Sequence, residues 1–125
     1  MVRSIISIIV ASTLIIGCAV YENLYLKSTF DGLTEVFLAV KGKIDDENCD
    51  ESDVVAAQKC WLDKKKKLHV FIPHTEIKEV DLWVSECVAY SRAGNYEEAG
   101  GKVEVILELF EQIPKTFLVR IENLF

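Results

Sequence analysis

The chain has 125 residues, of which 50% are hydrophobic and only two are prolines, and its formal net charge is −6. This length and composition predict one compact folded domain and exclude a disordered chain. The negative charge excludes nucleic acid as the expected partner, because binding to a phosphate backbone depends on basic residues, and Lys64–Lys67 is the one strongly basic run.

The first predicted element is an uncharged, isoleucine-rich segment from Ser4 to Tyr21. As a helix rising about 1.5 Å per residue it would be roughly 27 Å long, close to the thickness of a bilayer's hydrocarbon core. We therefore predict that residues 1–21 form an N-terminal membrane anchor and that residues 22–125 form a separate domain. The apolar residues expected to contact lipid include Ile5, Ile8, Ile9, Leu14, Ile15 and Ile16.

Four interpretations of this segment are open. In an uncleaved signal-anchor, Arg3 stays in the cytoplasm under the positive-inside rule, and Tyr21 lies at the far interface. In a lipoprotein signal, Ile15-Ile16-Gly17-Cys18 is the lipobox and Cys18 is acylated. The segment would otherwise be a cleaved secretory signal or a buried helix of a soluble core, although it has no polar face.

The first three interpretations agree on topology. Each places residues 22–125 outside the cytoplasm, and the favoured signal-anchor makes the chain a single-pass protein of the cell membrane with a cytoplasmic N-terminus. The signal-anchor is favoured because the lipobox is degenerate and no clear small-x-small cleavage site is present.

A long helix is predicted next, because apolar residues recur at alternating intervals of four and three. This seam begins close after Tyr21, so we expect the anchor and the helix to be continuous. The acidic segment Asp45–Asp53 follows and is expected to be a solvated loop, since it lacks the glycine and the terminal spacing of a calcium site. Asp50 should cap the next helix together with Asp53. The seam consists of Leu26, Phe30, Leu33, Phe37, Val40 and Ile44.

Two shorter helices follow. The second is predicted from about Glu51 to Ile72, and the third begins after Pro73-His74, with Thr75 as its N-cap. The third helix is expected to end at Gly94. The residues expected to be buried on these helices are Val54, Ala57, Trp61, Leu68, Phe71, Ile72, Ile77, Val80, Val84, Cys87 and Val88.

The fourth helix should begin at Asn95, which has Glu98 three residues later. Pro114 is expected to kink or divide this helix. Its apolar seam is Ala99, Val103, Ile106, Phe110 and Ile113, and the same phase resumes at Phe117, Ile121 and Leu124.

These patterns predict an all-α fold, in which a transmembrane or signal-anchor helix precedes an up-and-down bundle of about four helices. No segment alternates long enough to predict a strand. The stretch Ala93–Ala99 is similar to the turn inside a tetratricopeptide repeat, but an array requires about three such units.

Few residues indicate chemistry. Cys60 and Cys87 would lie level in a hairpin of the second and third helices, so a disulfide between them is one alternative and two buried thiols, which we favour, are the other. His69 and His74 straddle a helix end without a CxxC or HExxH motif, so neither a metal site nor a cofactor is expected. Trp61 is expected in the core, and the alternative is that Trp61, like His74 in the turn, contacts a partner.

Catalysis is not expected, because the sequence contains no GxSxG motif and no glycine-rich phosphate loop. A helical bundle of this size also seldom encloses a nucleophile beside a base.

Several stretches resemble the bacterial domain-of-unknown-function family 4363, which comprises small proteins of Gram-positive bacteria. They are Tyr21–Leu26, Trp61–Leu68, Phe71–Ile77, Ile113-Pro114 and Ile121–Phe125, and they span nearly the whole chain. The chain departs from the family pattern at His74-Thr75 and in having more cysteines. The resemblance implies an N-terminal anchor followed by helices, and it implies no activity.

We therefore expect a non-enzymatic, membrane-anchored interaction or scaffold module that docks on another envelope protein. One alternative is a lipoprotein-type binding protein that holds a small apolar ligand or an ion between its helices. Another is self-association through the seam from Leu26 to Ile44.

Overall fold

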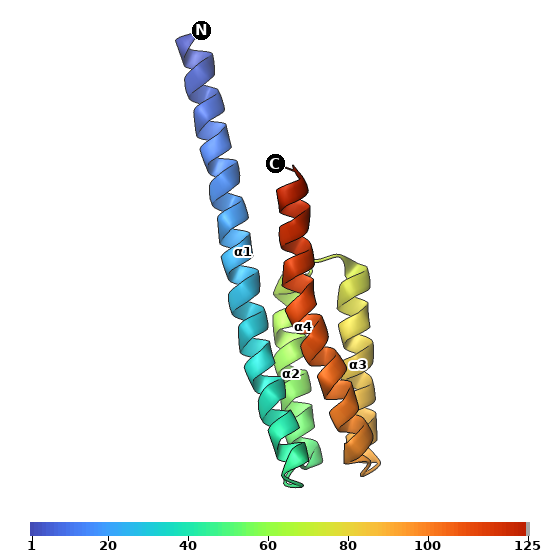
Figure 1. The fold of residues 1–125 in the computed structure, drawn as a ribbon. Helices are drawn as coiled ribbons and strands as arrows, with labels where there is room; N and C mark the ends of the chain where they lie inside the picture. The colour runs from blue at the N-terminus through green and yellow to red at the C-terminus, as the bar shows by residue number, and fades with distance from the viewer. Residues whose placement is uncertain (125) are drawn as a thin grey trace.

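The computed structural model describes the backbone of residues 1–124 and the side chains of residues 1–116. The elements are α1 (Val2–Asp45), α2 (Glu51–Leu68), α3 (His74–Arg92) and α4 (Tyr96–Leu124), and residues 1–124 contain no strand. Figure 1 shows the four helices running up and down, with the N-terminal half of α1 projecting beyond the others. The predicted all-α bundle with a protruding N-terminal helix is confirmed.

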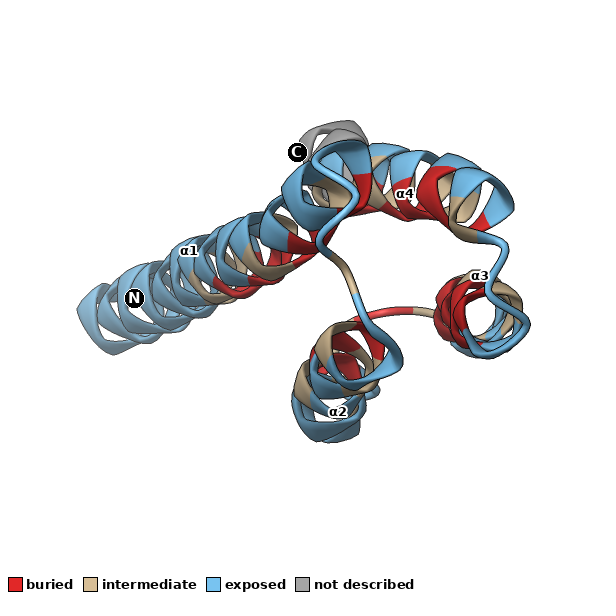
Figure 2. Cartoon of the chain, turned by 90° about the horizontal axis from the view of Figure 1, so that it is seen from below, coloured by how far each residue is buried: buried red, intermediate tan, exposed pale blue. Residues whose placement is uncertain are grey.

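The four helices surround one core. Helix α1 packs against α2 and α4, and α3 packs against the same two helices. Figure 2, which views the bundle from one end, shows the buried residues on the sides of the helices that face one another. The N-terminal half of α1 is exposed all round in the same view.

Helix α1 is one continuous helix of 44 residues that joins two different environments. Residues 1–18 are all exposed. From Leu26 onward the predicted seam is buried, up to Ile44 at 9% exposure. Continuity between the apolar segment and the bundle is therefore confirmed. The interpretation of Ser4–Tyr21 as a buried helix of a soluble core is wrong, because its side chains have no protein to pack against.

Aromatic rings from three helices meet in the middle of the core. The ring of Phe110 on α4 lies 5.7 Å from that of Phe30, 5.4 Å from that of Phe37 and 5.9 Å from that of Trp61, measured between centroids. Burying one such side chain contributes about 1.5–3 kcal/mol of stabilisation. This cluster therefore holds α1, α2 and α4 together.

The predicted caps form at two helix starts. Asp50 Oδ1 accepts from the Asp53 amide at 3.1 Å, and the Asp50 amide donates to Asp53 Oδ2 at 3.1 Å, which makes a capping box at the start of α2. Asn95 Oδ1 accepts from the Glu98 amide at 3.3 Å. Gly94 has φ +75°, the left-handed conformation in which glycine commonly follows a helix end.

The structure corrects the expected boundary between α2 and α3. Helix α2 ends at Leu68 rather than near Ile72, because the chain must turn before Pro73, whose ring disfavours a helical residue ahead of it. Ile72 is still buried, at 5% exposure. Helix α3 begins at His74 without a side-chain cap, so the assignment of Thr75 as N-cap is wrong.

Helix α4 continues through Pro114 to Leu124, so of the two expected effects of this proline, a kink or a division, the division is wrong. Proline in a helix removes one backbone donor, and its ring crowds the carbonyl four residues earlier, but the helical turns on both sides are retained here. The predicted continuation of the apolar seam falls on side chains outside the described residues, at Phe117, Ile121 and Leu124.

Candidate anchor and interaction surfaces

The N-terminal half of α1 has an exposed apolar surface on every side. Among residues 1–124, α1 is the one helix long and apolar enough to cross a membrane, by length and composition only, and a signal sequence passes the same test. The side chains predicted to contact lipid are between 55% and 64% exposed, namely Ile5, Ile8, Ile9, Leu14, Ile15 and Ile16.

Aromatic residues mark the place where α1 leaves the bundle. The rings of Tyr21 and Tyr25 stack one turn apart with centroids 6.4 Å apart. The ring of Tyr25 also lies 5.4 Å from that of Phe71, in the connection between α2 and α3. Tyrosine is enriched at membrane interfaces because its ring is apolar and its hydroxyl is polar.

A cleft of about 720 Å³ lies between α1 and α4, on the part of α1 that follows the apolar segment. Its apolar lining comes from both helices and includes Leu38, whose side chain is 52% exposed although it is large and apolar. The other apolar lining residues are Phe30, Leu107, Phe110 and Pro114.

The rim of this cleft is charged and mainly acidic. One lysine of the rim is neutralised within the chain, because Lys115 Nζ lies 3.0 Å from Glu111 Oε1. Glu104 is partly neutralised by Lys41, at 3.6 Å. The charged rim residues are Lys27, Asp31, Glu104, Glu108, Glu111 and Lys115.

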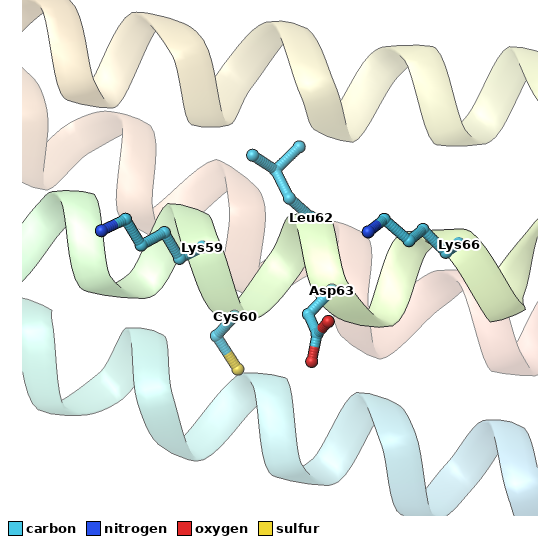
Figure 3. A pocket seen from close by; sticks show the side chains of 5 residues that line it. All are labelled: Lys59, Cys60, Leu62, Asp63 and Lys66. Atoms are coloured by element: carbon cyan, nitrogen blue, oxygen red, sulfur yellow. The ribbon is translucent and has the colours of Figure 1, made fainter.

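A shallower hollow of about 460 Å³ lies on α2. Figure 3 shows its five lining side chains on this one helix, with the Cys60 thiol and the Asp63 carboxylate on the side that faces α1. The lining contains no histidine, so the hollow does not place a base of that kind beside the thiol. The lining residues are Lys59, Cys60, Leu62, Asp63 and Lys66.

The sequence model of the domain of unknown function DUF4363 matches residues 20–124. The chain belongs to the DUF4363 family. The match covers the bundle, whereas most of the apolar half of α1 precedes it. No curated protein and no solved structure matches the chain significantly.

The cysteines of this DUF4363 protein are all free thiols. Cys87 is buried on α3, and its Sγ donates to the carbonyl of Ala99 on α4 at 3.6 Å. Cys60 is half-buried, and Figure 3 shows its thiol directed toward α1. The two side chains thus point to different neighbours, and the structure contains the thiol alternative rather than the disulfide. Burial, with a smaller contribution from Cys49, raises the pKa of Cys87 to about 11.

The two residues named as partner contacts have different surroundings in the DUF4363 protein. Trp61 is 1% exposed and belongs to the core, so its assignment as a partner contact is wrong. His74 is exposed, and its ring lies 5.5 Å from that of His69 across the α2–α3 connection. No group of three or more metal-ligating side chains occurs among the described residues, these two histidines included.

The seam from Leu26 to Ile44 is buried inside the bundle of the DUF4363 protein. Its side chains pack against the protein's own helices, so a second copy does not reach them in this fold. The cleft between α1 and α4, by contrast, is an open apolar surface on the bundle itself, and the sequence did not indicate it.

Proposed function

We propose that this DUF4363 protein is a membrane-anchored, non-enzymatic interaction module of the bacterial envelope, which binds another envelope protein in the cleft between α1 and α4. The observation that carries the proposal is the position of that cleft. It lies on the same continuous helix as the exposed apolar segment, just beyond the length that would cross a bilayer.

The membrane anchor is supported by the surface of α1. Apolar side chains on every side of residues 4–21 are stable in a hydrocarbon layer and unstable in water. Arg3 precedes the segment, so the positive-inside rule places the N-terminus in the cytoplasm and the bundle outside it. A Gram-positive cell envelope fits the family resemblance seen in the sequence.

The partner that fits the cleft is an amphipathic helix with basic residues beside its apolar face. An apolar groove between two helices accepts a third helix through side chains spaced three and four residues apart. The rim carries four acidic residues and two lysines, which favours a basic helix over an acidic one. A second copy of this chain would bring net charge −6 to the same rim, so self-association is disfavoured.

A small apolar ligand in the same cleft is the second candidate. The volume of about 720 Å³ falls within the roughly 300–1,000 Å³ of small-molecule sites. Native mass spectrometry of the full chain, released from detergent, separates this candidate from the first. A bound small molecule would support the ligand, and a clean mass of the chain alone would exclude it.

The helix-binding function is tested by photo-crosslinking in bacterial cells that produce the protein. A photoreactive residue replaces Leu38 in the cleft, and the control carries it at Leu82 on α3, which is 55% exposed and outside the cleft. We expect a discrete protein adduct from position 38 and none from position 82. Glu108→Lys should weaken the adduct, because it reverses one charge of the acidic rim.

Two outcomes would contradict the proposal. One is the same set of adducts from both positions, which indicates random collisions. The other is no adduct from position 38 while the protein is folded and in the membrane fraction.

A further inference from the structure

The connection between α2 and α3 lies at the membrane end of the bundle. Figure 1 shows it at the end from which the apolar half of α1 projects, whereas the connections α1–α2 and α3–α4 lie at the opposite end. The contact between Tyr25 and Phe71, at 5.4 Å between ring centroids, places the connection level with Tyr25. The orientation of the bundle thus follows from the direction of α1.

The depth of this connection follows from helix geometry. Tyr25 is one turn beyond Tyr21, where the apolar segment ends, and four residues of helix advance about 6 Å. The headgroup layer on each side of a bilayer is about 5–8 Å thick, from a total of about 40–45 Å around a core of about 30 Å. Phe71 and its neighbours therefore lie at the depth of the headgroups when α1 spans the bilayer.

The connection exposes an apolar side chain at this depth. Val70 is 79% exposed, more than any other large apolar side chain in residues 2–116. In water such exposure is unfavourable, and the headgroup layer removes part of the side chain from water. The side chain next to it in sequence, Phe71, is half-buried against Tyr25.

The two ends of the bundle also differ in charge. The last turn of α2, just before the connection, is basic. Lys65 is paired with Asp81 at 2.7 Å, while Lys64, Lys66 and Lys67 form no ion pair with the side chains of residues 1–116. The acidic segment Asp45–Asp53 lies at the opposite end, where the connection itself is shorter than predicted because α1 extends to Asp45 and α2 begins at Glu51.

The membrane end of the bundle carries fewer acidic residues than the opposite end. Glu22 on α1 and Glu76 in the first turn of α3 are the carboxylates of the turns that flank the connection. Asp63, which precedes Lys64 on α2, is a third carboxylate, so the unpaired lysines balance the acidic residues here and leave this end far less acidic than the opposite one. Lysines near an anionic bilayer surface are attracted to it within a Debye length.

We infer that the α2–α3 connection, with Val70 at its tip and Lys64, Lys66 and Lys67 beside it, is seated in the headgroup layer of an anionic bilayer. The contact rests on the proposed anchor, because α1 sets the depth of the connection. It adds a second attachment that fixes the tilt and rotation of the bundle. The cleft between α1 and α4 is thereby held at a constant angle to the membrane.

The test measures the depth of Val70 with the full chain in vesicles. Val70→Cys carries an environment-sensitive fluorophore, in a background where Cys18, Cys49 and Cys60 are serine and the buried Cys87 is retained. The matched control is Asn48→Cys, which is exposed in the loop at the opposite end. The vesicles contain equal amounts of phosphatidylcholine and phosphatidylglycerol, with a fraction of lipid carrying a spin label just below the headgroup.

We expect the spin-labelled lipid to quench most of the emission at position 70 and none at position 48. Replacing Lys64, Lys66 and Lys67 together with serine should reduce the quenching at position 70, as should vesicles of phosphatidylcholine alone. Equal quenching at the two positions, or none at either, overturns the inference. Flotation with the vesicles is scored in the same samples, so a chain that fails to float contradicts the anchor, and a chain that floats without quenching at position 70 contradicts only the surface contact.

Discussion

The indole nitrogen of Trp61 donates a hydrogen bond of 2.7 Å to Oδ1 of Asp81, which joins α2 to α3. The other carboxylate oxygen accepts from Lys65 Nζ at 2.7 Å. Trp61 is 1% exposed, so its nitrogen would be a buried donor without a partner if Asp81 were absent. The Asp81 carboxylate therefore accepts the one hydrogen bond that Trp61, the largest fully buried side chain, can donate from its ring.

Asp81→Ala should lower the free energy of unfolding by about 1–3 kcal/mol, because it leaves that buried donor unsatisfied. Urea denaturation of the full chain in detergent micelles, followed by circular dichroism, measures the change. The control is Asp63→Ala on the exposed surface of α2, which should change the same quantity by no more than about 0.5 kcal/mol. Equal effects of the two substitutions would contradict the role of Asp81.

Much of the fold could be predicted from the sequence, because the period of a helix depends only on its own residues. The seam from Leu26 to Ile44 is buried at every predicted position. The caps at Asp50 and Asn95 were also predictable, since each acts on an amide three residues away. Short stretches of the sequence resemble family 4363, and the match of the family model to residues 20–124 confirms the resemblance.

Features that depend on the packing of separate helices were not predictable. The residue spacing predicts Cys60 and Cys87 at the same level of the hairpin, but one thiol faces α1 and the other bonds to α4. The partner of Trp61 lies twenty residues away on another helix. The cleft depends on Leu38, which is outside the seam of its own helix, so only the placement of α4 shows that it lines a groove.

Two adjacent glycines of α4 should respond differently to an added methyl group. A Cβ at Gly101 meets no atom within 4 Å, whereas one at Gly100 would lie 3.3 Å from Ile44 Cγ2 on α1. Gly101→Ala should raise the free energy of unfolding by about 0.5–1 kcal/mol through helix propensity. Gly100→Ala should stabilise less or destabilise, because α1 must move away. Denaturation of both variants gives their order, and a more stable Gly100→Ala would refute the close contact.

The buried thiol of Cys87 should resist alkylation. Its pKa of about 11 leaves about one thiolate in a thousand at pH 8, and burial blocks access to the rest. We expect iodoacetamide to modify Cys87 only after denaturation, with the same masses with and without reductant. Protection of both Cys60 and Cys87 that reductant removes would establish the disulfide alternative instead.

The raised pKa of Cys87 also predicts that the folded protein loses stability at alkaline pH. Because the unfolded chain releases the Cys87 proton near the ordinary pKa of 9.0 and the folded chain does so near 11, stability should fall as the pH rises between these values. Cys87→Ala should remove this component of the alkaline decline. Unfolding midpoints of both proteins measured from pH 8 to pH 11 test this prediction. If the variant loses stability just as the natural protein does, other groups cause the alkaline decline.

The stability of the folded protein at acidic pH should depend on Asp53. Lys43 Nζ lies 2.7 Å from Asp53 Oδ1, and this hydrogen bond, followed by the one from the Asp50 amide, lowers the pKa of Asp53 below 3.8. The stabilisation is therefore present above pH 3.8 and is lost as the pH falls through the lower pKa of the folded state. Asp53→Asn should flatten this acid decline in unfolding midpoints. Asp46→Asn, in the connection before α2, removes a carboxylate without an ion pair among the described residues and should retain the decline.

Cys18 distinguishes the two forms of membrane attachment. It is exposed on α1, and the helix continues through it for more than 25 residues into the bundle. A lipoprotein would be cut before this cysteine and would lose the apolar residues on its N-terminal side. The signal-anchor retains them, so we expect the mature protein in cells to have its full mass, to incorporate no fatty-acid analogue, and to stay in the membrane fraction after Cys18→Ser.

The same measurement of the membrane fraction on Leu14→Arg provides the contrast. A charge near the middle of the span costs at least about 2.5 kcal/mol on insertion, so this variant should leave the membrane fraction while Cys18→Ser does not. Fatty-acid label on the natural protein that disappears in Cys18→Ser, together with a mass that begins at residue 18, would instead establish the lipoprotein. In that outcome the bundle would be tethered by a flexible acyl group, and the orientation that α1 gives to the α2–α3 connection would be lost.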